Sequence, residues 1–231
     1  MDIETLTSTI ENTLNIRKHP DDILSDLSII QDCINSMHPH LRRDIISFKY
    51  RPKWYNGNIS NHTKLLHDIA SLYDMYIIPE IKDKYDDFIS KHRGRDLILY
   101  RGVYSTPSYD VLKWKQGDEI QQVFPMSTSI YADSPLLYSD TDDNTGVFIS
   151  LRIPIDHGFL GIFTDNHIMN MSRDETKHLF KSGRLDSEVT LLPGTMKLDS
   201  KTTIHNLPVY HMSYSTYTYS EWIDEYVKYR P

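Results

Sequence analysis

The chain has 231 residues, with 25 Lys or Arg against 32 Asp or Glu, so its formal net charge is −7. This sign disfavours nucleic acid as a partner, because proteins that bind phosphate backbones present a basic surface. The single cysteine, Cys33, excludes a disulfide framework and a cysteine-based zinc site. No apolar run approaches the ~18 residues of a membrane-spanning helix, and residues 1–4 lack the features of a signal peptide. We therefore expect an intracellular protein that does not bind membranes.

Residues 1–95 are predicted to form a helical N-terminal region. Apolar residues recur every three or four positions over 3–14, 23–37 and 65–76, which is the period of an amphipathic helix. Pro79 is expected to break or kink the third of these helices. The pattern leaves two roles open, which are recognition of a target and coverage of a sheet face, and we favour coverage.

Residues 96–231 are predicted to form a second, mainly β region. A short apolar run over 97–100 is typical of a strand, and residues 189–192 and 202–214 also have an extended pattern. The strict alternation of apolar residues from Val147 to Ile155 predicts a half-buried strand. Helices first and strands afterwards indicate an α+β fold in which helices pack on a sheet assembly.

Metal binding is not expected. The acidic stretch 140–146 resembles a calcium loop only superficially, since Thr145 and Leu151 stand where an EF-hand requires Gly and Glu. The histidines are scattered without a pair at helical spacing. The chain also has neither a glycine-rich dinucleotide fingerprint nor a P-loop, so a nucleotide would have to be held in another way.

Three short segments in the β region carry candidate chemistry. Arg101 ends an apolar strand, where a guanidinium is suited to clamp a phosphate or carboxylate, and Gly102 after it permits close approach to the backbone. Residues 127–129 are Ser-Thr-Ser, whose hydroxyls can orient a carboxylate or bind a sugar. Asp186 and Glu188 lie two positions apart, which puts them on the same face of an extended chain. Two such carboxylates can divide cation stabilisation and proton removal between them.

In this order, Tyr100-Arg101-Gly102, Ser127-Thr128-Ser129 and Glu188 followed by Val-Thr-Leu-Leu-Pro-Gly-Thr resemble the arginine–serine–glutamate class of mono-ADP-ribosyltransferases. That class includes cholera-toxin-like and clostridial toxins, and the resemblance spans residues 97–214. It implies a split β-sandwich of two perpendicular sheets with NAD+ in the cleft between them. It also implies transfer of ADP-ribose to a target protein, without a metal.

The resemblance assigns a role to each motif residue. Arg101 would hold the NAD+ phosphates, the backbone of Gly102 would face the nicotinamide amide, and Ser127 would orient Glu188. Glu188 would bind the ribose 2′-hydroxyl as the principal catalytic residue. An aromatic after the middle strand would stack on nicotinamide. The residues implied to contact or frame NAD+ are Tyr100, Arg101, Gly102, Ser127, Thr128, Ser129, and either Phe159 or Phe163.

The resemblance also implies a substrate-recognition loop before Glu188, on which Phe180 would contact the target protein. The chain departs from the family pattern at Asp186, where arginine-modifying members carry Glu and asparagine- or cysteine-modifying members carry Gln. A carboxylate at Asp186 can still receive the proton of the acceptor, so arginine is the favoured acceptor. The alternatives are an NAD+ glycohydrolase and a non-enzymatic interaction module on a degenerate transferase fold. A small transferase of this kind suits a viral or bacterial effector.

Overall fold

The structure is a computed structural model of the whole chain. It describes the residues of the β region most fully, together with parts of the N-terminal region. The described residues are 3–13, 22–23, 25–26, 78–105, 110–122, 126–132, 135–136, 139, 145–155, 161–164, 188–191 and 194–216.

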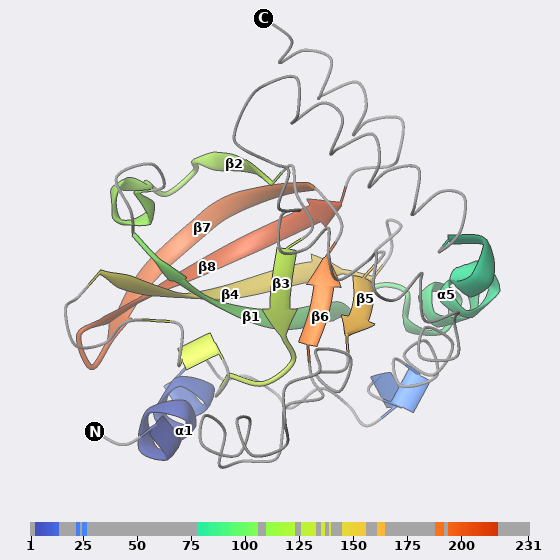
Figure 1. Cartoon of the computed structure of the whole chain (residues 1–231), viewed down its shortest axis with the longest axis horizontal. Helices are drawn as coiled ribbons and strands as arrows, with labels where there is room; N and C mark the ends of the chain where they lie inside the picture. Colours follow the sequence, from blue (N-terminus) through green and yellow to red (C-terminus); the bar gives the residue numbers. More distant parts are fainter. Residues whose placement is uncertain are drawn as a thin grey trace, which may run out of the picture.

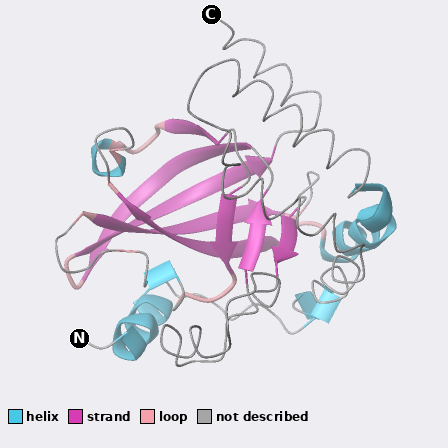
Figure 2. Cartoon of the chain, in the orientation of Figure 1, coloured by secondary structure: helices cyan, strands magenta, loops and turns pink. Residues whose placement is uncertain are grey.

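In the described part of the chain, two helices precede all the strands, as the sequence predicts, and a short 3₁₀ turn follows the first strand. Figure 2 shows these helices around the strands of the sheet. The helices are α1 (Ile3–Thr13), α5 (Ile78–His92) and the short 3₁₀ turn η2 (Val111–Lys113). The strands are β1 (Asp96–Tyr104), β2 (Glu119–Gln122), β3 (Met126–Ser129), β4 (Gly146–Pro154), β5 (Gly161–Thr164), β6 (Glu188–Leu191), β7 (Gly194–Ile204) and β8 (Leu207–Thr216).

Two helix predictions can be compared with these elements. The helix predicted from Ile3 is present as α1. Pro79 lies at the second position of α5, where a proline is tolerated because the first turn of a helix has no intrahelical partner for its N–H groups. The helices predicted over 23–37 and 65–76 lie almost entirely outside the described residues.

The described strands form one sheet in the order β2-β7-β8-β4-β1-β3-β6-β5. All neighbours are antiparallel except β4 and β8, which are parallel. The junction between β1 and β3 consists of a single pair, Tyr100 opposite Ser129. In Figure 1, β3, β6 and β5 run across the direction of β1 and β4, so the sheet changes direction at this junction.

The central strand β4 is buried on both faces, and the prediction of a half-buried strand is wrong in this respect. Val147, Ile149 and Leu151 are fully buried, but so is Phe148 between them, and Arg152 is the first exposed side chain. Phe148 belongs to a hydrophobic cluster with Leu6, Ile10, Tyr100, Ala132, Leu136, Ile204, Leu207 and Val209. The face expected to be polar is therefore covered, in part by α1.

Helix α1 covers one face of the sheet. Leu6 and Ile10 are one turn apart on the helix, and both are buried in the same cluster as Tyr100 and Phe148. This arrangement agrees with the expectation that the N-terminal helices serve to cover a sheet face. The role of the remaining N-terminal residues stays a prediction.

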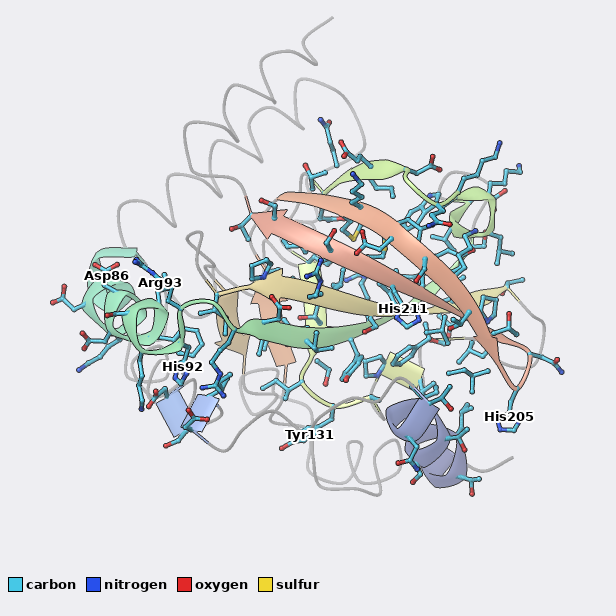
Figure 3. The ribbon with its side chains drawn as sticks, turned by 180° about the vertical axis from the view of Figure 1, so that it is seen from behind. Asp86, His92, Arg93, Tyr131, His205 and His211 are labelled. Atoms are coloured by element: carbon cyan, nitrogen blue, oxygen red, sulfur yellow. The ribbon has the colours of Figure 1, made fainter. Side chains whose placement is uncertain are left out.

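An ionic cluster connects Asp22 and Asp26 to the end of α5. The ring of His92 is fully buried, with Nε2 at 2.7 Å from Asp26 Oδ2 and Nδ1 at 2.9 Å from Arg95 Nη1 (Figure 3). Because the guanidinium of Arg95 can only donate, Nδ1 accepts from Arg95 and Nε2 donates to Asp26. Arg95 also contacts Asp22 Oδ2 at 2.7 Å and thereby lowers the pKa of Asp22 to about 2.

The long strands β7 and β8 form a hairpin with a two-residue turn at His205 and Asn206. Both residues have positive φ, 50° and 69°, as a turn that matches the strand twist requires. His205 lies at the tip of this hairpin, away from the β1–β3 junction (Figure 3). The hairpin supplies β8, which pairs with β4 and completes the core.

Candidate active site

The three motif segments lie on three neighbouring strands. Arg101 is on β1, residues 127–129 are on β3, and Glu188 begins β6. These strands are consecutive in the sheet, although the segments are far apart in the sequence. The fold therefore gathers a guanidinium, a run of hydroxyls and the backbone of a glutamate at the place where the sheet turns (Figure 1).

Arg101 connects β1 to β3. Its Nη1 donates a hydrogen bond of 2.7 Å to the main-chain oxygen of Ser127, and the side chain remains partly exposed. Successive residues on a strand alternate between faces, so Arg101 lies on the face opposite to Tyr100, which belongs to the cluster under α1. The cation is therefore on the side of the sheet that α1 does not cover.

The hydroxyl segment fixes β3 against β6. Ser129 is the register partner of Glu188, and Thr128 is the partner of Val189. The hydroxyl of Thr128 donates 2.6 Å to the main-chain oxygen of Val189, the residue immediately after Glu188. Thr128 is buried, so this bond is shielded from water and holds the backbone of β6 at the position of Glu188.

The three hydroxyl residues differ in exposure. Thr128 and Ser129 are buried, whereas Ser127 is partly exposed. The hydroxyl oxygen of Ser129 accepts 3.1 Å from the backbone N–H of Tyr131, which stabilises the chain where it leaves β3. Ser127 is thus the member of the segment that solvent, or a ligand, can reach.

Gly102 is packed against the chain itself on the α1 side. A Cβ placed there would lie 2.0 Å from the main-chain oxygen of Pro135 and 2.9 Å from the backbone nitrogen and the hydroxyl of Ser139. The absence of a side chain is therefore required by the turn after β3, which is a short helical turn at Pro135 and Leu136 together with Ser139. Approach of a ligand to the backbone of Gly102 from another direction stays a prediction.

Several predicted site residues lie outside the described residues. These are Asp186, Phe159 and Phe180, together with the acidic stretch 140–144. Phe163 is on β5, where its register partner is Val189, while Thr164 next to it is paired with Glu188. The sequence reasoning missed Ser139, because an isolated serine in a loop carries no recognisable pattern.

Two further observations concern metals and membranes. Among the described residues, no group of His, Cys, Asp or Glu side chains is arranged to hold a metal ion. No helix in the described part of the chain combines the length and the apolar composition needed to cross a bilayer.

The comparisons with known proteins found likeness only at the level of structure. No family model matches the chain, and no curated protein matches it in sequence. The C3 exoenzyme of Clostridium limosum has a TM-score of 0.47 at 10% identity, over 84% of this chain and 94% of that chain. An ADP-ribosyltransferase of Clostridium botulinum has a TM-score of 0.48 at 11% identity, over 86% and 96%. The Vis toxin of Vibrio splendidus, also an ADP-ribosyltransferase, has a TM-score of 0.41 at 13% identity, over 87% and 88%.

Two of these three solved structures, from Clostridium botulinum and Vibrio splendidus, are named as ADP-ribosyltransferases.

Proposed function

We propose that the protein transfers ADP-ribose from NAD+ to a side chain of a target protein and releases nicotinamide. The observation that carries the proposal is the linked set on β1, β3 and β6. Arg101 is hydrogen-bonded to β3 at Ser127, and β3 is hydrogen-bonded to β6 next to Glu188. A cation, a partly exposed serine and a carboxylate-bearing residue thereby belong to one continuous backbone unit.

This set of groups fits NAD+. A guanidinium has five N–H donors in a fixed planar arrangement, so Arg101 has the chemistry to bind a pyrophosphate in addition to the oxygen of Ser127. Ser127 is accessible enough to bond to a ribose or to the carboxylate that serves it. The proposed reaction needs no metal ion.

The reaction breaks the bond between ribose C1′ and the nicotinamide nitrogen. The bonding electron pair leaves with nicotinamide, which departs neutral, so no acid is needed to protonate it. Positive charge builds on the ribose, as in the oxocarbenium-like transition state of glycoside cleavage. The carboxylate of Glu188, at the ribose 2′-hydroxyl, stabilises that charge more in the transition state than in the ground state. A single well-placed group of this type contributes ~10²–10³ in rate.

The acceptor is proposed to be an arginine. A guanidine nitrogen of the target attacks C1′ and gives up a proton, which the carboxylate of Asp186 receives. Asp reaches one methylene less than Glu, so this step is the most sensitive to how the target docks. Phe180, on the loop before Glu188, is proposed to contact the target. If water takes the place of the arginine, the product is free ADP-ribose.

The test is incubation of the purified chain with adenine-labelled NAD+ and a host-cell lysate, beside Glu188→Gln. Glu119→Gln, on an exposed position of the edge strand β2, is the matched control. Label on protein that Glu188→Gln abolishes and Glu119→Gln retains supports transfer. Release of nicotinamide without labelled protein replaces transfer with NAD+ hydrolysis. Equal activity in Glu188→Gln and wild type overturns the proposal.

A further inference from the structure

The turn after β3 packs directly behind the strand that carries Arg101. The main-chain oxygen of Pro135 lies where a Cβ of Gly102 would be, and Ser139 contacts the same space through its backbone nitrogen and its hydroxyl. Because Arg101 and Gly102 are adjacent on β1 and alternate between faces, the turn supports the backbone from the side opposite to the guanidinium. The turn therefore limits how far β1 can move in the direction opposite to the guanidinium of Arg101.

Ser139 holds the turn in that position. Its side chain is buried, and its hydroxyl lies 3.1 Å from the main-chain oxygen of Pro135 and 3.3 Å from that of Val147 on β4. Its backbone N–H donates 3.2 Å to the oxygen of Leu136. One hydroxyl proton is therefore shared between the turn and the central strand. Ser139 therefore links the turn to strand β4 of the sheet.

The turn is also continuous with the hydroxyl segment of β3. Ser129 accepts a hydrogen bond from Tyr131, and the backbone N–H of Leu136 donates 3.2 Å to the oxygen of Ala132. Ala132 and Leu136 are both buried in the cluster under α1. These hydrogen bonds connect the end of β3 to Leu136, and Pro135 beside it contacts Gly102.

We propose that Ser139 is a positioning residue for Arg101, which it serves by holding the main-chain oxygen of Pro135 against Gly102. The inference rests on the proposed function, since the guanidinium that it positions is the one assigned to the NAD+ phosphates. Ser139 does not touch NAD+. It restrains the backbone at Gly102 while the single pair between Tyr100 and Ser129 restrains it one residue before Arg101. Arg101 lies between these two restraints.

Removal of the Ser139 hydroxyl releases the turn from β4 and lets Gly102 move. The phosphate clamp then loses its alignment in the ground state and in the transition state alike, which raises KM without a matching loss of kcat. We expect Ser139→Ala to raise KM for NAD+ about fivefold, the effect of one hydrogen bond of ordinary strength. The value of kcat should change by less than about twofold.

The experiment compares wild type, Ser139→Ala and the control Ser150→Ala. Ser150 is a buried serine on β4 that pairs with Tyr100, so the control removes a hydroxyl from the same face without touching the turn. Nicotinamide release gives kcat and KM, and hydrogen–deuterium exchange of the peptide 99–104 reports on β1 in the free protein. A higher KM with faster exchange in Ser139→Ala alone supports the inference. Ser139→Cys, which keeps the volume with a weaker donor, takes its place if the alanine variant does not fold.

Three results overturn the inference. If the wild type is active and the KM for NAD+ is unchanged in Ser139→Ala, the inference is wrong and the proposed function still stands. This holds even if the variant is less stable. Unchanged exchange of the peptide 99–104 rejects the mechanism whatever the activity. A wild type that neither binds NAD+ nor releases nicotinamide rejects the proposed function and this inference with it.

Discussion

The guanidinium of Arg101 donates a 2.7 Å hydrogen bond to the main-chain oxygen of Ser127. β1 and β3 share one register pair, at Tyr100 and Ser129, so this side chain extends the connection beyond the backbone ladder. A residue proposed to bind phosphate is therefore also part of the framework that joins the two parts of the sheet. Substitutions of Arg101 should consequently affect both ligand binding and stability.

Arg101→Lys tests this double role. A lysine keeps the charge but not the planar fork, so it cannot hold Ser127 and a phosphate in the same geometry. We expect NAD+ affinity to fall by about 1.5–3 kcal/mol, the range for hydrogen bonds to charged groups. Isothermal titration calorimetry measures the affinity, and urea unfolding measures the accompanying loss of stability. The matched control is Arg152→Lys, because Arg152 lies exposed on the neighbouring strand β4, 3.6 Å from Asp96. Equal affinity in both variants would contradict a phosphate role for Arg101.

Thr128→Val tests the bond between β3 and β6. Valine has nearly the same shape but leaves the main-chain oxygen of Val189 without the hydroxyl donor, in a buried place. The expected loss in the free energy of unfolding is about 1–3 kcal/mol, the cost of a buried group without its hydrogen bond. Chemical denaturation measures it, and Thr203→Val at an exposed position of β7 serves as the control. If the two variants are equally stable, the Thr128 bond does not hold β6.

Gly102→Ala tests the close packing of the turn behind β1. The added methyl would meet the backbone of Pro135, which cannot swing aside as a side chain would. We expect a loss of about 3 kcal/mol, the upper part of the usual range for overpacking. Gly94→Ala is the comparison, since its Cβ would meet nothing within 4 Å while its φ of +78° still carries a backbone cost of ~1–2 kcal/mol. A smaller loss in Gly102→Ala than in Gly94→Ala, in urea unfolding, would show that the turn yields easily.

The pair formed by Asp22 and Arg95 predicts a dependence of stability on pH. The hydrogen bond from Arg95 lowers the pKa of Asp22 from 3.8 to about 2. A carboxyl whose pKa is lower in the folded state stabilises the fold above pH 3.8, and that contribution is lost as the pH falls towards 2.

The difference in urea midpoint between wild type and Asp22→Asn should therefore be constant from pH 7 to about 4 and shrink below it. This difference in urea midpoint should be small at neutral pH, because the side chains of Asp22 and Arg95 are partly exposed and solvent screens the pair. In an Arg95→Gln background the same comparison should show a much weaker pH dependence. A difference that persists unchanged at pH 2 to 3 would mean that Asp22 acts through something other than its charge.

The register of β5 distinguishes the two candidate aromatics. Phe163 is the register partner of Val189, which is fully buried in the core, and the two partners of a pair share a face of the sheet. We therefore predict that Phe159→Ala raises KM for NAD+ by up to about tenfold, consistent with the loss of a stacking contact of ~0.5–1.5 kcal/mol. Phe163→Ala should lower stability instead. Steady-state nicotinamide release and thermal unfolding on both variants decide the assignment, and a raised KM in Phe163→Ala alone reverses it.

The local residue pattern predicted the location of the strands better than it predicted their burial. The apolar run at Leu97 and the alternation from Val147 identified β1 and β4, because a period of two is a property of the strand itself. The same alternation gave the wrong burial for β4. Whether Phe148 faces solvent depends on what covers it, and Leu6, Ile10 and Val209 come from distant parts of the chain.

In the candidate site, too, the sequence pattern identified the residues but not their tertiary contacts. The ordered motifs led to Arg101, Ser127 and Glu188 through a resemblance, and the strand order then brought their backbones into one unit. Nothing in the residue pattern indicated that Thr128 bonds to the oxygen of Val189. The packing of Gly102 against the turn after β3 also depends on tertiary contact and was read in the sequence as an opening for a ligand.

The parallel pairing of β4 with β8 has a consequence for synthesis of the protein. Phe148 is the partner of Val209, about 60 residues later in the chain, so β4 has no neighbour on that edge until the β7–β8 hairpin has left the ribosome. An apolar strand with an open edge is a point where nascent chains associate wrongly. Chains that are truncated before residue 194 and released from the ribosome should therefore aggregate. Binding of chaperones to the nascent chain should decrease once β8 has been translated. In this fold, the strand that completes the core is nearly the last to be made.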